Sequence, residues 1–161
     1  MKTNATRALE TLGISYDLLH YSVNLDDLSA TSTAQKLGLP ADQIFKTLVT
    51  QSSAQSGFEG VALAVIPGSY RLDLKALARL SGERKVETVA LKQVQPLTGY
   101  IRGGVTAIAC KRTYPVFLDE WAQVYDQIAV SAGARGQMLM LTVDDYVKAT
   151  GATIGAISRE R

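Results

Sequence analysis

Cysteine and histidine are almost absent from this sequence of 161 residues, because Cys110 and His20 are the single examples of each. One cysteine cannot form an intrachain disulfide, and one of each residue cannot supply the ligand set of a zinc site. We therefore expect neither a disulfide scaffold nor a metal centre. A serine hydrolase triad that relies on histidine is not indicated either.

Long apolar runs are also missing. The first residues, 1–5, contain no apolar signal core, and no run is long enough to cross a bilayer. The net charge of +2 excludes a broad polybasic surface, so any contact with nucleic acid should be local. These absences predict a cytoplasmic protein with no membrane partner.

The remaining composition is that of a soluble globular protein, with 47% hydrophobic and 20% charged residues. A chain of this length suits one domain with a sizeable core. No internal repeat, low-complexity tract or linker interrupts the sequence. We therefore expect residues 1–161 to form a single domain.

Hydrophobic periodicity predicts short helices mixed with short strands. Asn4 and Asp73 are expected N-caps, and Pro96 is expected to end the helix that begins at Val89. Helices are expected at 5–12, 30–37, 74–80, 89–94 and 143–149, and strands at 14–21, 44–50, 60–67, 85–87, 115–118, 127–131 and 138–141. Because this order is not a regular βαβ alternation, it favours an α+β domain with one curled, mainly antiparallel or mixed central sheet that resembles a barrel, surrounded by short helices.

Lys46 lies within the strand predicted at 44–50, which carries apolar residues on both faces and should be central. Burying an ammonium group without a partner is costly. One interpretation is a lysine near the end of the strand whose charge reaches water. The other is a lysine that points into a pocket and binds an anion such as a phosphate.

Two glycine-bearing loops are the other unusual features. The first contains Gly99, Gly103 and Gly104, and the second, at 132–136, contains one arginine, Arg135. Glycine allows the backbone to approach a ligand closely, and exposed N–H groups can bind an anion or an oxyanion. Each loop could equally be a simple turn, and neither matches a P-loop.

Four stretches follow one another in a specific order: KLGL at 36–39 with DQIFKTL at 42–48, RLDLK at 71–75 with KVE at 85–87, TGY at 98–100 with GG at 103–104, and VSAGARG at 130–136. Together they resemble the bacterial YbaK/EbsC family of free-standing aminoacyl-tRNA editing domains. That family is similar to the editing domain of bacterial prolyl-tRNA synthetase. The resemblance covers nearly the whole chain and implies hydrolysis of mischarged Cys-tRNA(Pro), with Cys-tRNA(Cys) as a further substrate.

The resemblance also implies roles for individual residues. Lys46 would hold the acceptor end through phosphate or ribose, and Gly103 and Gly104 would stabilise the ester carbonyl as its oxygen becomes negative. No cofactor or metal is implied, because the thiol of the substrate cysteine would attack its own ester. The residues expected to bind the substrate are Tyr21, Thr106, Ser131, Gly133 and Arg135.

The sequence departs from the family in two places. The family loop Gly-Gly-x-Ser-Pro-x-Gly lacks its proline and last glycine here, where Thr106 and Ala107 replace Ser-Pro. A family phenylalanine falls at Leu28 or Ser29. These changes keep two alternatives open: a deacylase for tRNA that carries Ala, Ser or Thr, and a non-catalytic module that binds tRNA or a synthetase. The resemblance implies prolyl-tRNA synthetase as a partner in a ternary complex.

Overall fold

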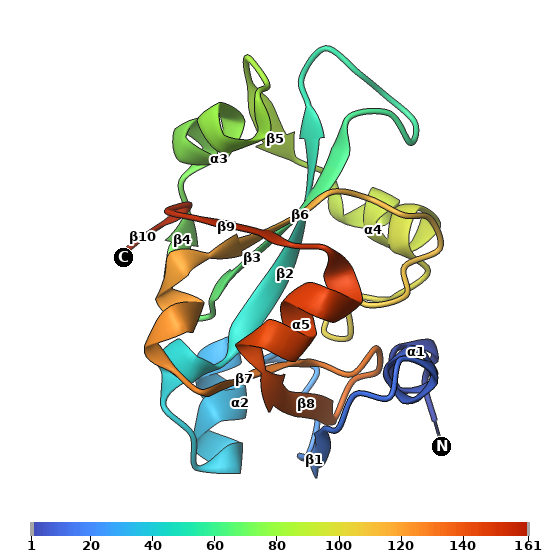
Figure 1. Cartoon of the computed structure of the whole chain (residues 1–161), viewed down its shortest axis with the longest axis vertical. Helices are drawn as coiled ribbons and strands as arrows, with labels where there is room; N and C mark the ends of the chain where they lie inside the picture. The colour runs from blue at the N-terminus through green and yellow to red at the C-terminus, as the bar shows by residue number, and fades with distance from the viewer. Residues whose placement is uncertain (1, 161) are drawn as a thin grey trace.

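Residues 2–160 are described in a computed structural model, in which helices surround a set of paired strands (Figure 1). The helices of this range are α1 (Asn4–Thr11), α2 (Ala30–Leu37), α3 (Leu74–Ser81), α4 (Leu91–Thr98) and α5 (Val143–Thr150), with 3-10 turns η1 (Ala41–Gln43) and η2 (Glu120–Val124). The strands are β1 (Asp17–His20), β2 (Phe45–Ser52), β3 (Val61–Pro67), β4 (Arg71–Leu72), β5 (Val86–Thr88), β6 (Val116–Asp119), β7 (Gln127–Ser131), β8 (Gln137–Thr142), β9 (Thr153–Gly155) and β10 (Ser158–Arg159).

The described strands pair in three sheets. The largest has the order β5-β2-β3-β6-β9, the second β1-β8-β7, and the third β10-β4. Pairing is antiparallel except for β3 with β6 and β6 with β9. An isolated bridge between Ile44 and Ala129 joins the start of β2 to β7. The predicted α+β class is confirmed, although the strands are divided among three sheets rather than gathered in one.

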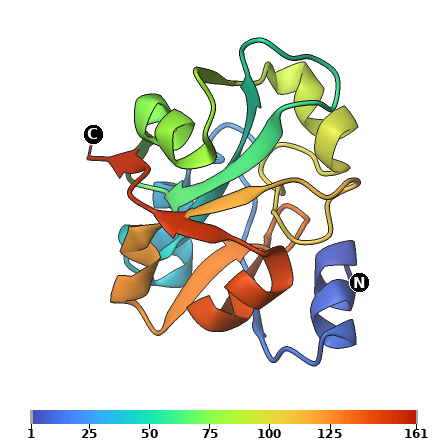
Figure 2. The same ribbon diagram turned by 45° about the horizontal axis from the view of Figure 1, so that its top comes forward.

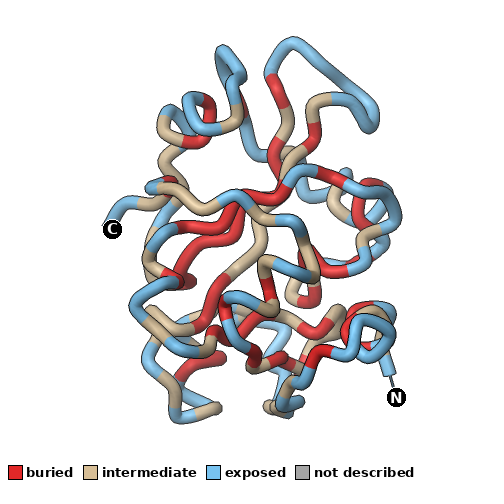
Figure 3. Tube along the Cα trace, viewed as in Figure 1, coloured by how far each residue is buried: buried red, intermediate tan, exposed pale blue. Residues whose placement is uncertain are grey.

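Strand β2 lies inside the largest sheet, between β5 and β3, as expected from its two apolar faces. Phe45 and Val49 belong to the main core, whereas Leu48 packs against a second core on the opposite face. Ile44 belongs to a third core beside α2. Burial is concentrated in the central strands, and the connections at the periphery are exposed (Figure 3).

Helix caps follow the sequence signals closely. Ser29, Asp73 and Thr142 each accept a hydrogen bond from the backbone N–H three residues ahead, which fixes the start of α2, α3 and α5. The helices lie on the outside of the strands when the molecule is turned (Figure 2). In residues 2–160 no helix is both long enough and apolar enough to cross a bilayer.

Three local predictions were wrong. The N-cap of α1 is Thr3 rather than Asn4, because Thr3 and Thr6 form a reciprocal capping box. Pro96 lies inside α4 rather than beyond it, since burial of Leu97 and Thr98 in the domain keeps the last turn helical. The strand expected from residue 14 begins at Asp17, where pairing with β8 begins.

Candidate active site

A pocket of about 450 Å³ opens beside Lys46. Its wall is built from β2, the first turn of α2, the end of β7, the start of α4 and the loop that contains Gly103. These segments are far apart in the sequence, so the pocket exists only once the sheets have assembled. Pockets of this size and mixed lining are typical of sites for small ligands.

Lys46 is half-buried on β2, and its side chain reaches the backbone of the turn after β3. The Nζ atom donates a hydrogen bond to the carbonyl oxygen of Gly68 at 3.3 Å. Gly68 in turn donates its N–H to the carbonyl oxygen of Ile44 at 2.7 Å. A Cβ at this glycine would lie 2.0 Å from the Cβ of Ala30. This close approach holds the lysine-bearing strand against the first turn of α2.

The charge of the lining is positive. Lys46 and Arg102 are its two cations, and the described lining residues include no aspartate, glutamate, histidine or cysteine. Hydroxyl groups are present instead, from Tyr21, Thr47 and Ser131 among others. Such a wall favours an anionic or polar ligand, and its described residues provide no carboxylate, imidazole or thiol for acid–base or nucleophilic chemistry.

The first turn of α2 adds to the positive potential. Ser29, Ala30 and Thr31 line the pocket, so the start of the helix faces its interior. Backbone N–H groups at a helix N-terminus carry partial positive charge and attract anions. Asp27 accepts a hydrogen bond from the Ser29 N–H at 3.1 Å, and bonding to the Ser29 side chain and backbone lowers the pKa of this carboxyl. Asp27 does not line the pocket.

The adjacent residues Gly103 and Gly104 differ in their position relative to the pocket. Gly103 lines the pocket and has a positive φ of 87°, which favours glycine. Gly104 is buried behind it, and its N–H donates to the carbonyl oxygen of Ile101 at 2.9 Å. A Cβ at Gly104 would lie 3.1 Å from the backbone of Ala134. Gly104 therefore allows two loops to pack closely, and its N–H is already engaged.

The two glycine loops pack closely against each other and are joined by a hydrogen bond. Gly133 has a φ of 94°, and a Cβ there would lie 2.8 Å from the ring of Tyr100. Arg135 donates from Nε to the carbonyl oxygen of Arg102 at 2.7 Å. Ser131 lies where β7 ends, and its Oγ accepts from the Gly133 N–H at 3.2 Å. The second loop thus supports the first, as well as contributing Ser131 to the pocket.

Thr106 lies in the core rather than in the pocket wall. It is fully buried, and its Oγ1 accepts a long hydrogen bond of 3.4 Å from the Ile108 N–H. Cys110 packs nearby, donating from Sγ to the carbonyl oxygen of Thr106 at 3.2 Å. Burial raises the pKa of the Cys110 thiol to about 11, so this group is neutral and unreactive near pH 7.

The structure thus brings together four of the residues singled out from the sequence, since Tyr21, Lys46, Gly103 and Ser131 line one pocket. The other four lie behind or beside it, where they pack or hold loops: Gly104, Thr106, Gly133 and Arg135. Arg102 and the first turn of α2 were missed. For Arg102 the available signal was its position directly before Gly103.

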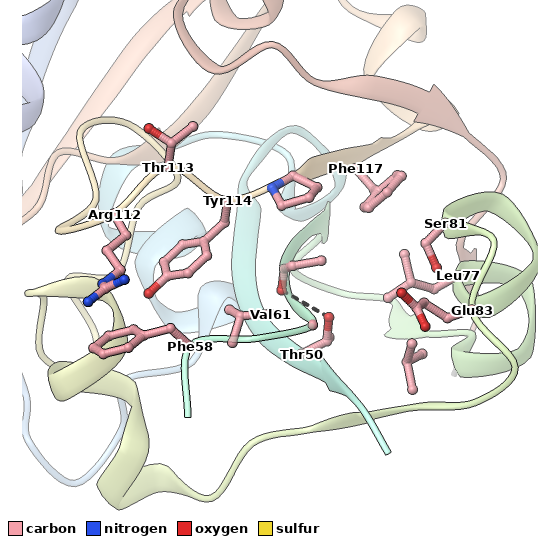
Figure 4. Close-up of a pocket in the computed structure, with 14 residues that line it drawn as sticks. Thr50, Phe58, Val61, Leu77, Ser81, Glu83, Arg112, Thr113, Tyr114 and Phe117 are labelled. Atoms are coloured by element: carbon pink, nitrogen blue, oxygen red, sulfur yellow. Dashed lines mark hydrogen bonds between the residues drawn. The ribbon is translucent and has the colours of Figure 1, made fainter. Parts of the chain in front are cut away.

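A second pocket, of about 310 Å³, lies where the β2–β3 hairpin meets α3 and the segment before β6 (Figure 4). Arg112 places its guanidinium carbon 3.6 Å from the centre of the Phe58 ring, and Glu83 lies on the opposite side. The floor includes Val61 and Phe117. None of the residues expected from the sequence to act on a substrate lines this second pocket.

Known proteins match this architecture. The sequence profile of the aminoacyl-tRNA editing domain matches residues 28–149, which contain Lys46 and both glycine loops. The chain belongs to the aminoacyl-tRNA editing domain family. It is therefore an aminoacyl-tRNA deacylase, a hydrolase of ester bonds, and the resemblance seen in its sequence is confirmed.

Individual relatives agree with this assignment. An Enterococcus faecalis protein named "Putative Cys-tRNA(Pro)/Cys-tRNA(Cys) deacylase EbsC" is 42% identical over 157 residues, which cover 98% of this chain and 93% of the relative. A crystal structure described as a putative trans-editing enzyme for prolyl-tRNA synthetase is 27% identical with a TM-score of 0.80, covering 99% of each chain. A crystal structure of a hypothetical protein reaches a TM-score of 0.86 at 25% identity, covering 98% of this chain and all of the other.

Within residues 2–160 no group of three or more His, Cys, Asp and Glu side chains could hold a metal ion. The described lining of the pocket beside Lys46 consists of cations, hydroxyl groups, backbone and apolar side chains.

Proposed function

We propose that this protein is a trans-editing hydrolase that deacylates Cys-tRNA(Pro), and also Cys-tRNA(Cys), in the pocket beside Lys46. The observation that carries the proposal is the content of the lining: two cations, a helix N-terminus and no carboxylate, histidine or cysteine. The cations suit the phosphate-bearing end of a tRNA. The absence of a carboxylate, imidazole or thiol from the described lining suits a reaction in which the substrate provides its own nucleophile. The alignment with EbsC over nearly the whole chain supports one editing domain at 1–161.

Lys46 and the first turn of α2 hold the 3′-terminal nucleotide through its phosphate or ribose. An ammonium group serves this purpose as a point charge. Tyr21 and Ser131 lie in the same lining and confine the aminoacyl group. Holding the ester in one orientation brings the thiol of the cysteinyl group close to its own carbonyl carbon, which removes much of the entropic cost of the reaction.

The thiol sulfur then attacks the carbonyl carbon. A carbon–sulfur bond forms, the bond from that carbon to the ribose oxygen breaks, and the thiol proton ends on the ribose oxygen. The products are a cyclic thioester of cysteine, which water opens, and the free tRNA. The Gly103 N–H, which donates to no protein acceptor in residues 2–160, stabilises the carbonyl oxygen while it is negative. Gly104 contributes by packing, because its own N–H is engaged with Ile101.

Prolyl-tRNA synthetase is the proposed partner in a ternary complex. The net charge of +2 provides little long-range attraction for tRNA, so selection of the correct tRNA falls to a second protein. Adding the synthetase should lower KM for Cys-tRNA(Pro) without changing kcat. An unchanged KM in its presence would remove the partner from the proposal.

The experiment that tests the function compares hydrolysis of Cys-tRNA(Pro), Ala-tRNA(Pro) and Ser-tRNA(Pro) by the wild type and by Lys46→Ala. We expect rapid loss of the cysteinyl ester alone, slowed by at least about tenfold by the substitution. Loss of the alanyl or seryl ester would contradict thiol-assisted chemistry and favour a deacylase that positions water with the lining hydroxyl groups. No hydrolysis of any ester would favour a module that binds tRNA or a synthetase without catalysis.

A further inference from the structure

The side chain of Arg135 contacts the backbone of Arg102 at the edge of the pocket. Arg102 is exposed and belongs to the lining, and Arg135 comes from the loop between β7 and β8. The Arg135 Nε donates to the Arg102 carbonyl oxygen at 2.7 Å, which ties together segments 33 residues apart. No carboxylate lies within 4.0 Å of either guanidinium group among residues 2–160, where the ion pairs involve other residues.

Lys46 and Arg102 line one pocket whose described lining contains no carboxylate, and the resulting positive potential favours the binding of an anion. Guanidinium groups match phosphate geometry with two parallel hydrogen bonds. Lys46 is half-buried inside the pocket, whereas Arg102 is exposed at the edge. If the terminal nucleotide of an RNA strand enters the pocket, the phosphates that precede this nucleotide would pass close to Arg102.

We propose that Arg102 binds a backbone phosphate of the single-stranded RNA that precedes the esterified nucleotide, and that Arg135 positions the loop carrying Arg102. This inference rests on the proposed function, because it takes the tRNA acceptor end as the occupant. It adds a phosphate contact at the edge of the pocket to the contact with phosphate or ribose assigned to Lys46.

Arg135 is suited to position the loop that carries Arg102, because its side chain both packs against this loop and donates a hydrogen bond to it. A Cβ at Gly103 would lie 3.3 Å from both Cγ and Nε of Arg135. The aliphatic part of Arg135 therefore covers Gly103 while its Nε holds the preceding carbonyl group. Loss of this side chain would free the loop without removing the guanidinium group of Arg102.

The test compares a substrate with upstream phosphates and one without them. Kinetics are measured on Cys-tRNA(Pro) and on cysteinyl-adenosine, a nucleoside ester that lacks phosphate, after subtraction of the spontaneous rate. Arg102→Ala should raise KM for the tRNA by about tenfold and leave the nucleoside ester unchanged. The dependence of log kcat/KM on log salt should become shallower by roughly 0.7–1, the contribution of one phosphate contact.

Arg102→Lys should restore the salt dependence, because it restores the charge. Arg135→Ala should raise KM for the tRNA in the same direction. The double variant Arg102→Ala/Arg135→Ala should lose less than the product of the two single effects, because both act through one contact. Arg79→Ala is the matched control: it removes an exposed arginine on α3, which contributes no residue to the pocket, and should change neither KM nor the salt dependence.

A separate binding measurement keeps this inference independent of catalysis. Uncharged tRNA(Pro) is titrated with wild type, Arg102→Ala and Arg79→Ala over a range of salt concentrations. We expect weaker, less salt-dependent binding for Arg102→Ala alone. Equal affinity and equal salt slopes for the three proteins would overturn the phosphate contact, even if the wild type deacylates Cys-tRNA(Pro). If Arg102→Ala lost as much kcat/KM on cysteinyl-adenosine as on Cys-tRNA(Pro), that result would also overturn the phosphate contact.

Discussion

The pocket beside Lys46 and the pocket beside Arg112 differ in what surrounds their cations. Beside Lys46, the described lining contains two cations and no carboxylate. In the second pocket, Arg112 lies over the Phe58 ring, and the lining also contains Glu83 (Figure 4). A cation stacked on an aromatic ring has a local structural role, and a carboxylate nearby opposes the binding of an anion.

A hollow in the protein surface is therefore not by itself a functional site. Both pockets have volumes of several hundred Å³ and adjoin the same sheet. The first also gathers, from distant parts of the chain, a helix N-terminus and Gly103, whose N–H donates to no acceptor within residues 2–160. Convergence of such groups, more than volume, marks a place where charge can be stabilised.

Replacing one cation in each pocket tests most directly whether the two pockets differ in function. Lys46→Met should lower kcat/KM by roughly 10- to 150-fold, because a hydrogen bond to a charged group contributes about 1.5–3 kcal/mol. Arg112→Met, the matched change, should leave kcat/KM unchanged. Steady-state deacylation measures both, with circular dichroism to verify folding. Similar losses for the two variants would show that the pockets do not differ in function.

The next largest effect concerns the packing of the glycine loops. Gly104→Ala should destabilise the protein by about 1–3 kcal/mol and lower kcat, because the Ala134 backbone would have to move away from the new Cβ. Gly82→Ala is the control: its φ of 78° strains alanine, but nothing lies within 4 Å of the new Cβ. Denaturant titration should detect a loss of stability in both, and kinetics a loss of kcat in Gly104→Ala alone.

A smaller effect is expected in the second pocket. Phe58→Ala removes the ring under Arg112 and should lower the free energy of unfolding by about 0.5–1 kcal/mol, the contribution of an exposed cation–π pair. Deacylation should not change. In the double variant with Arg112→Ala, the losses should not add, because both substitutions remove one interaction. A fall in kcat/KM for Phe58→Ala would assign this pocket a part in editing.

Cys110 gives the smallest expected effect on activity. Cys110→Ala should retain the wild-type kcat, since the thiol packs against Thr106 and does not line the pocket. In the folded wild type its pKa of about 11 leaves roughly one thiol in a thousand ionised at pH 8, so alkylation should be much slower than in denaturant. Rapid alkylation of the native protein would contradict this burial.

The same thiol makes stability depend on pH. Because the folded protein keeps the proton to a higher pH than the unfolded chain, the stabilisation is present below about pH 9 and is lost as the pH rises to about 11. Denaturant titrations at pH 8 and pH 10 should show a smaller decline for Cys110→Ala than for the wild type. An identical decline in the two proteins would rule out this linkage.

Local structure was largely predictable because it depends on near neighbours. Asp73 was correctly predicted as the N-cap of α3, where its short polar side chain accepts from the backbone N–H three residues on, and the range 30–37 of α2 was also predicted correctly. Where tertiary packing competes, prediction failed: Pro96 should end a helix, but the buried residues after it hold α4 together.

Side-chain alternation and backbone freedom are local properties, so the α+β class, the central position of β2, which carries Lys46, and the two glycine loops could be predicted from the residues alone. Assembly of the sheets was needed to bring Gly103 to the pocket and to leave Gly104 and Thr106 behind it. It likewise brought Arg102 to the edge and Arg135 to its support. The reason is physical: these placements depend on how closely two loops about 30 residues apart can pack, and neither loop specifies that alone.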